Sequence, residues 1–426
     1  EYALRLARDL EEEARTLSRI LVVECFGRES GYAPLGVGLG IGAARTLIPE
    51  VNIDFKEIIS DVELYVKRFN HAVVIVSEGI KVNINFGDNK AILEKAFTKD
   101  EEARVAFTKV KKTDAFGNPK LEGAGKIVTA VLSSHIKGIT TTEAPKLTYG
   151  PRVAPPIYPD LERCLLMGHT AIEYIFNGPF GHLLYFDQGK VRSISLDKPK
   201  GLGGRKVDIQ GDFKVHYTLA NKAILLKTNP EVFGGSSPIQ RIGILTGGGP
   251  AAGHNAVIYA AYVAAKLRGA ELVGIINGFD GLVNEKLVSQ ARVLTYEEVN
   301  RAKSLGGTIL GTDRINPYSK ENKEAGIPAK IWANIRKLFL DAQITLGGDD
   351  TNSAGANLSK EHDNFPVVGG SKTMDNDLSL PDNAVTYGFQ TWVEYALRLA
   401  RDLEEEARTL SRILVVECFG RESGYA

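Results

Sequence analysis

Short apolar runs alternate with helical patterns along most of this chain of 426 residues. The apolar runs lie at Ile20–Val23, Ala72–Val76, Ile242–Leu245, Leu272–Ile276, Ala342–Leu346 and Phe365–Val368. Patterns such as Ala256–Leu267 and Ile331–Leu340 indicate helices between them. Strands that alternate with helices form mainly parallel sheets with helices on both faces, and ligands bind at the carboxyl ends of their strands. We therefore predict an α/β protein whose site residues follow its strands.

One segment of the chain occurs twice, because residues Glu1–Ala33 recur without a change at Glu394–Ala426. The segment most typical of the start of such a fold, Pro238–Thr246, lies instead in the middle, after the linker-like residues 234–237. We interpret the chain as a circularly permuted unit that carries 33 residues twice. One folded unit has a single place for this helix and strand. We therefore expect the two copies to lie in different environments, or one to be exchanged with a neighbouring molecule.

Charge and composition exclude several classes of partner. The 52 basic and 52 acidic residues balance, so no overall field favours nucleic acid or an anionic membrane. No apolar run approaches the roughly 20 residues of a membrane span, and the pattern at Glu1–Ser18 is a charged helix rather than a signal peptide. The three cysteines, Cys25, Cys164 and Cys418, show no metal-ligand spacing and are too sparse for a disulfide framework. We predict a cytoplasmic protein.

A glycine-rich turn follows the strand at Ile242–Leu245 and spans Thr246–Asn255. Glycines let backbone amides approach a phosphate, and the following helix N-terminus favours negative charge. The same pattern is also typical of a tight strand-to-helix turn without a ligand. A second cluster, Gly36–Gly42, lacks the strand and acidic residue of a dinucleotide site, so we interpret it as close packing.

Two polar segments follow the next strands, Gly347–Thr351 and Ser371–Asp377. Asp349 could hold magnesium, which prefers oxygen ligands and phosphate oxygens. Of Asp375 and Asp377, one could act as a general base while the other orients it, and Lys372 supplies a compact cation for a phosphate. Taken separately, each segment could instead be an acidic helix cap or a solvated loop.

Together these motifs resemble, in permuted order, the phosphofructokinase family over nearly the whole unit. The resemblance implies two Rossmann-like three-layer α/β/α domains with mainly parallel sheets and an active site in the cleft between them. It implies a phosphoryl-donor domain at residues 238–388 plus about 151–200, and a sugar-phosphate domain at residues 1–150 plus about 201–235. It also implies magnesium (Mg2+) as cofactor, fructose 6-phosphate as substrate, and a homodimer or homotetramer with sites completed across subunits.

The resemblance assigns a role to individual residues of this chain. The catalytic group comprises Thr373, Asp377, Lys372 and the base Asp375, and the metal ligand is Asp349. The donor group comprises Gly247, Gly248, Gly249, Asp350 and Arg314. The sugar-phosphate group comprises Arg19, Phe26, Gly27, Arg28, Glu78, Tyr149 and Arg152, with Arg412, Phe419, Gly420 and Arg421 as duplicates in the second copy. One of the two family arginines matched by Arg19 and Arg28 crosses a subunit interface.

The segment Tyr149–Pro156 departs from the family pattern, since tyrosine stands where many relatives have histidine, and a third sugar-phosphate arginine has no clear counterpart. For the donor, ATP-using relatives usually have glycine where Asp350 stands, and many bacterial ones have glycine where Lys372 stands. A carboxylate at Asp350 opposes a further phosphate, so the pair favours pyrophosphate. The alternatives are an ATP-dependent phosphofructokinase, a sedoheptulose-7-phosphate kinase, and an inactive sugar-phosphate-binding protein.

Overall fold

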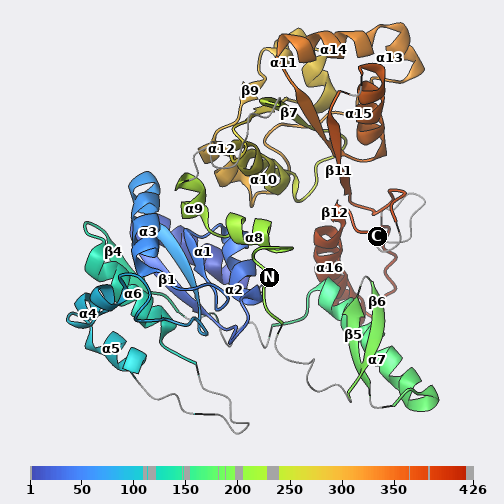
Figure 1. The fold of residues 1–426 in the computed structure, drawn as a ribbon. Helices are drawn as coiled ribbons and strands as arrows, with labels where there is room; N and C mark the ends of the chain where they lie inside the picture. The colour runs from blue at the N-terminus through green and yellow to red at the C-terminus, as the bar shows by residue number, and fades with distance from the viewer. Residues whose placement is uncertain are drawn as a thin grey trace. The chain divides into compact units, whose positions relative to one another are not determined.

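The computed structural model describes residues 2–108, 113, 121–145, 147, 154–180, 182–187, 189–196, 205–227, 239–363, 365–381 and 384–418. The chain divides into two compact units (Figure 1). Unit 1 contains Glu1–Pro155 and Lys198–Thr228, and unit 2 contains Pro156–Asp197 and Asn229–Ala426.

Unit 1 is built on a four-stranded parallel sheet in the order β2-β3-β1-β4. Its strands are β1 (Arg19–Cys25), β2 (Arg45–Leu47), β3 (Ala72–Ser77) and β4 (Thr140–Glu143). Its helices are α1 (Tyr2–Thr16), α2 (Tyr32–Ile41), α3 (Phe55–Phe69), α4 (Asn89–Phe97), α5 (Glu101–Thr108), α6 (Ala124–His135), α8 (Lys214–Leu219) and α9 (Lys222–Lys227).

Helices cover both faces of the unit 1 sheet. Ile20 and Val22 of β1 pack in one buried cluster with α3, α4 and α6, while Leu21 and Val23 pack in another with α1 and α2. Successive residues of a strand point to opposite faces, so a strand covered on both faces is apolar throughout. This arrangement explains the continuous apolar run in β1.

Unit 2 contains a six-stranded sheet in the order β12-β11-β10-β7-β8-β9. Its strands are β7 (Arg241–Thr246), β8 (Glu271–Gly274), β9 (Arg292–Val293), β10 (Ala342–Gly347), β11 (Val367–Thr373) and β12 (Tyr387–Gly388). All neighbours pair in parallel except β8 and β9. If the strands are numbered along the chain from β7, their order across the sheet, read from β9 to β12, is third, second, first, fourth, fifth, sixth. This is the strand order of the Rossmann fold, and its topological switch point lies between β7 and β10.

The remaining elements of unit 2 are helices and one hairpin. The helices are α7 (Tyr158–Asn177), α10 (His254–Lys266), η4 (Gly278–Leu282), α11 (Glu285–Val288), α12 (Tyr296–Ala302), α13 (Lys320–Glu324), α14 (Ile327–Lys337), α15 (Asp349–Glu361) and α16 (Phe389–Thr409). Strands β5 (His182–Asp187) and β6 (Lys190–Ser195) form the antiparallel hairpin. Residues of β7, β8, η4, α14 and α15 form a buried apolar cluster. Among the described residues, no helix is long and apolar enough to span a membrane.

The predicted α/β class and parallel strands are confirmed, with one local correction. The run Phe365–Val368 was expected to be a buried strand, but β11 starts at Val367 and the side chain of Val368 is 67% exposed. The buried part of β11 is its end, at Lys372 and Thr373. The packing interpretation of Gly36–Gly42 agrees with the structure, since a Cβ atom on Gly38 would lie 2.0 Å from Thr46 Oγ1.

The two copies of the repeated segment occupy different environments, which confirms the expectation from the sequence. In the first copy Val22 lies in the central strand β1 and is 0% exposed, whereas the corresponding Val415 is 94% exposed. Of the second copy, the structure describes residues 394–418, which contain most of α16 but no strand. The predicted linker 234–237 lies outside the described residues.

Candidate active site

Two polar segments meet at the topological switch point of unit 2. The glycine-rich loop Gly247–Gly253 follows β7, and Gly348, Asp349 and Asp350 follow β10. Strands β7 and β10 are hydrogen-bonded neighbours with Leu346 opposite Thr246, so both segments leave the sheet at the same edge. Ligands of doubly wound sheets bind at this edge.

The first glycines of this loop are required by its geometry. A Cβ atom on Gly247 would lie 2.5 Å from the Thr351 hydroxyl, and Gly248 has a φ of +80°, which is unfavourable for other residues. Their amides are already used, because Gly247 donates to Leu346 and Gly248 donates to Asp313. Of the three glycines whose amides were predicted to contact a phosphate, Gly249 therefore remains as the candidate.

Two cations lie beside the loop. Lys372, near the end of β11, is buried, and its Nζ atom lies 3.4 Å from where a Cβ atom on Gly248 would be. The exposed Arg314 has its guanidinium 3.8 Å from the corresponding position on Gly249. The structure thus brings Lys372, Arg314 and the loop together, which suits an anionic donor.

The hydroxyl of Thr373 contacts two carboxylates. Its Oγ1 atom lies 2.5 Å from Asp375 Oδ1 and 2.6 Å from Asp377 Oδ1. Because a hydroxyl carries one proton, Thr373 can donate to only one of them at a time. The structure therefore brings three of the four predicted catalytic residues, Thr373, Asp375 and Asp377, together at one atom, with Asp375 partly buried and Asp377 exposed.

Thr386 holds the turn that follows Thr373, and no motif in the sequence indicates this role. Its hydroxyl donates to the Thr373 carbonyl at 2.7 Å, and its amide donates to Asn376 Oδ1 at 3.0 Å. Asn376 has a φ of +52°, a conformation that asparagine tolerates better than most residues. These bonds hold the turn that carries Asp375 and Asp377.

A second unpredicted contact joins the end of the glycine-rich loop to β12, the strand that pairs with β11. His254, which begins α10, is fully buried, and its Nδ1 atom lies 3.0 Å from the hydroxyl of Tyr387 in β12. Burial and the charge of Lys372 lower the pKa of His254 to about 4, and burial raises the pKa of Tyr387. No sequence pattern joins two residues this far apart, since only the pairing of β11 with β12 brings Tyr387 to the loop.

Asp349 and Asp350 occupy the first turn of α15, and both are exposed. A carboxylate is favoured there by the helix dipole. The Ser353 hydroxyl donates to Asp349 Oδ1 at 3.4 Å, a weak bond. Within the described parts of the chain, no group of three or more histidine, cysteine or acidic side chains could hold a metal ion. A single exposed carboxylate such as Asp349 suits a metal that takes most of its ligands from water or substrate.

The predicted sugar-phosphate residues of unit 1 come together in part. Glu78 follows β3, and its Oε1 atom accepts the amides of Gly27 at 3.3 Å and Arg28 at 3.4 Å. The two loops touch closely, because a Cβ atom on Gly79 would lie 1.4 Å from the Arg28 carbonyl. Phe26, Gly27, Arg28 and Glu78 thus share the carboxyl edge of the unit 1 sheet.

Arg19 lies at the opposite end of β1 from Arg28. The strand between them has seven residues and spans roughly 23 Å at about 3.3 Å per residue. The structure therefore does not bring these two arginines to one phosphate within a chain. Arg412, the duplicate of Arg19, is exposed and pairs with Glu406 at 3.5 Å. Tyr149, Arg152, Phe419, Gly420 and Arg421 lie outside the described residues.

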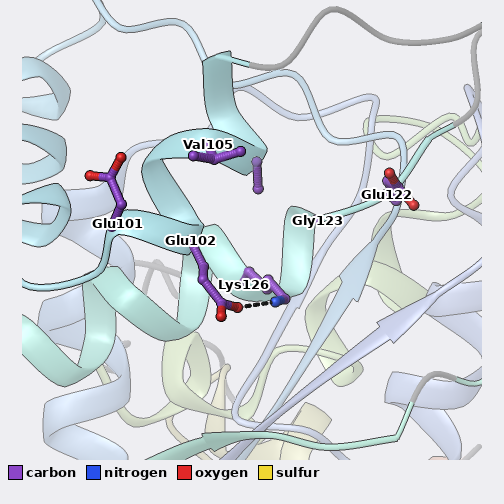
Figure 2. A pocket seen from close by; sticks show the side chains of 7 residues that line it. Glu101, Glu102, Val105, Glu122, Gly123 and Lys126 are labelled. Atoms are coloured by element: carbon purple, nitrogen blue, oxygen red, sulfur yellow. Dashed lines mark hydrogen bonds and ion pairs between the residues drawn. The ribbon is translucent and has the colours of Figure 1, made fainter.

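Unit 1 also has a pocket of about 400 Å³ (Figure 2). It is lined by Glu101, Glu102, Val105, Ala106, Glu122, Gly123 and Lys126. Lys126 donates to Glu102, as the dashed line shows. None of the predicted site residues lines this pocket.

The chain is similar over most of its length to one family of known proteins. A family model described as Phosphofructokinase matches residues 1–173 and 241–426. The pyrophosphate–fructose 6-phosphate 1-phosphotransferase of Thermotoga maritima is 39% identical over 187 residues, which cover 44% of this chain and 43% of that protein. The ATP-dependent 6-phosphofructokinase of Chloroflexus aggregans is 38% identical over 194 residues, which cover 45% and 52%. The chain spans about half the length of these curated relatives.

The fold also matches a solved structure. The phosphofructokinase structure from Saccharomyces cerevisiae has a TM-score of 0.71 at 19% identity, covering 95% of this chain and 50% of that one. At this identity the match concerns the fold alone, which is α/β with mainly parallel sheets.

Proposed function

The chain belongs to the phosphofructokinase family, and we propose that it transfers a phosphoryl group from pyrophosphate to the 1-hydroxyl of fructose 6-phosphate. The observation that carries this proposal is the gathering of Lys372 beside the glycine-rich loop with Thr373 and Asp375 at the adjoining turn. Phosphoryl transfer needs such cations and a base more than it needs covalent chemistry from the protein.

In the proposed reaction Asp375 accepts the proton of the 1-hydroxyl as its oxygen attacks the nearer phosphorus atom of pyrophosphate. The bond from that phosphorus to the bridging oxygen breaks, and phosphate leaves. The Thr373 hydroxyl orients Asp375, and the ammonium of Lys372 stabilises negative charge on the transferring group. Because pyrophosphate and phosphate differ modestly in transfer potential, we expect the reaction to be reversible.

We propose that Asp349 holds Mg2+ in this site. An exposed carboxylate in a helix first turn fits this ion, which commonly takes one or two carboxylates and completes its shell with water and substrate phosphates. When bound, Mg2+ would neutralise part of the negative charge of the donor.

The choice of pyrophosphate over ATP rests on Asp350 and Lys372. Both residues belong to unit 2, with Asp350 in the first turn of α15 and Lys372 buried beside Gly248. A carboxylate opposes an additional phosphate, and a buried cation suits a small, highly charged donor. The curated relatives include both pyrophosphate-dependent and ATP-dependent enzymes, so ATP is the second candidate donor.

The sugar-phosphate end of the proposed site uses Glu78 and the segment Phe26–Arg28, which share one sheet edge. A contribution from Arg19 to the same phosphate would need a second chain, because Arg19 lies at the other end of β1. We therefore propose that the active protein is a homodimer or homotetramer.

The test is fructose 1,6-bisphosphate formation from fructose 6-phosphate and Mg2+, with pyrophosphate or ATP as donor in parallel reactions. Turnover with pyrophosphate alone supports the proposal. Turnover with ATP alone replaces the donor and keeps the reaction. Activity with neither donor, in a protein that binds pyrophosphate by calorimetry, contradicts the proposed reaction and favours another sugar phosphate, such as sedoheptulose 7-phosphate, or a binding protein.

A further inference from the structure

The second copy of the repeated segment carries an exposed apolar surface whose complement is present in the same protein. Ile413 is 92% exposed and Val415 is 94% exposed. The corresponding residues of the first copy, Ile20 and Val22, are 0% exposed. The two segments have the same sequence, so a surface that buries one of them is complementary to the other.

The surface that buries the first copy is well defined in unit 1, and we call it the seat. Strand β1 pairs in parallel with β3 on one side and with β4 on the other, so the seat includes two rows of backbone hydrogen-bonding groups. Helix α1 packs against α2, where Leu4 fills the space beside Gly40 and a Cβ atom would lie 2.4 Å from the leucine. Residues 2–25 therefore fit the seat through backbone pairing and side-chain shape together.

The second copy holds the same groups without these partners. Helix α16 is continuous from Phe389 and packs against α7, while residues 410–418 form no strand. Leu397 and Ile413 are the counterparts of Leu4 and Ile20, which contact α2 and the unit 1 core. Residues 394–418, the described part of the second copy, therefore have the same side chains as the residues that fit the seat. We call residues 394–418 the donor segment.

We propose that the donor segment inserts into the seat of a second copy of this chain. Each chain has one seat and two segments that fit it, so one segment per chain always lacks a seat in its own molecule. A neighbouring chain whose seat is open offers this segment the same parallel pairing with β3 and β4 that the first copy makes. Exchange of an identical element between molecules is a known route to association, and head-to-tail exchange forms rings or open chains.

Two matched substitutions test the proposal. Val22→Asp places a charge in the central strand and disables the first copy, while Val415→Asp makes the same change at an exposed position of the donor segment. Val22→Asp should therefore open the seat and leave the donor segment intact. Val415→Asp should leave the fold unchanged and disable only the donor segment. The double variant has an open seat and no functional segment.

Light scattering and sedimentation over a range of concentrations should show larger species for Val22→Asp than for Val415→Asp, with native-like circular dichroism in both. In a mixture, the labelled double variant should bind the unsubstituted chain. Its affinity for the Val415→Asp variant should be at least about tenfold weaker, because a charge would have to enter a buried strand. Equal sizes for the two single variants, or equal binding of the double variant to both chains, would overturn the proposal. Loss of fold in Val22→Asp equal to that in the double variant would also overturn it.

Discussion

The imidazole Nδ1 of His254 and the hydroxyl of Tyr387 lie 3.0 Å apart and join the start of α10, after the glycine-rich loop, to β12. His254 begins the helix that follows the loop, and Tyr387 is paired with Lys372 across β11 and β12. Whichever tautomer His254 adopts, its Nε2 atom is buried without a partner among the described residues. The Tyr387 hydroxyl thus meets the buried ring at Nδ1, and a hydrogen bond with the backbone of Gly249 also acts on this side chain.

Replacing Tyr387 with phenylalanine should destabilise the protein. The change keeps the ring and removes the hydroxyl that lies beside Nδ1 of a buried histidine, which costs about 1–3 kcal/mol. Chemical denaturation should show a lower free energy of unfolding. Tyr395→Phe is the matched control, because Tyr395 is 66% exposed. Equal stability of the two variants would contradict the role given to this bond.

The stability contributed by neutral His254 should be lost as the pH falls. Its pKa is lowered to about 4, first by burial and then by the charge of Lys372, whereas an unfolded histidine titrates near about 6.5. The folded state therefore binds fewer protons than the unfolded state between these values. The contribution of His254 to the free energy of unfolding is fully present above about pH 6.5. It declines by about 3 kcal/mol as the pH falls toward about 4.

Unfolding free energies of the unsubstituted protein and of His254→Gln, measured from pH 7 to pH 4, check this expectation. Their difference should shrink as the pH falls, because glutamine does not titrate. A difference that stays constant over this range would show that His254 does not cause the effect.

Asp375→Asn should lower kcat by about 100- to 10,000-fold, the usual contribution of a general base. The KM for fructose 6-phosphate should change much less, because the substitution keeps the shape of the side chain. Steady-state kinetics with pyrophosphate measure both constants. Asp363→Asn, at an exposed position of the same unit, should leave them unchanged. A kcat near that of this control would exclude Asp375 as the base.

Asp349→Asn should raise the Mg2+ concentration needed for half-maximal activity by about tenfold or more, since it removes the proposed carboxylate ligand. Asp350→Asn removes the same charge from the next residue of the same helix turn and serves as the control. A Mg2+ titration of initial rates distinguishes the two variants. Identical titration curves would mean that Asp349 acts only through the overall charge of the site.

Asp350→Gly should shift donor preference toward ATP. Removing the carboxylate relieves repulsion of a further phosphate, worth about 1 kcal/mol at about 4 Å in water. The ratio of kcat/KM for ATP to that for pyrophosphate should therefore rise at least about fivefold. A ratio that stays the same would remove Asp350 from the explanation of donor choice.

Much of the fold could be predicted because local pattern and burial agree in a parallel sheet. Strand β1 is apolar at every residue from Ile20 to Val23, since each face of the sheet is covered. The same reasoning led to the loop after β7 and the aspartates after β10, because strand ends of a parallel sheet share an edge.

The turn that carries Asp375 and Asp377 was predictable only in part. Thr373, Asp375 and Asp377 are close in sequence, so their contact is local. The hydrogen bond from Thr386 to Thr373 and the one between His254 and Tyr387 depend on the pairing of β11 with β12. No sequence period encodes this pairing.

The α/β class, the strands that carry the candidate site and the presence of one segment in two copies all follow from the amino-acid pattern alone. Which copy is buried depends on packing in three dimensions. Val22 lies between two partner strands, whereas Val415, with the same neighbours in sequence, lies in solvent. A strand is stabilised by the backbone groups and side chains of other strands, which lie far away in the sequence. Identical residues therefore remain exposed where those partners are already paired.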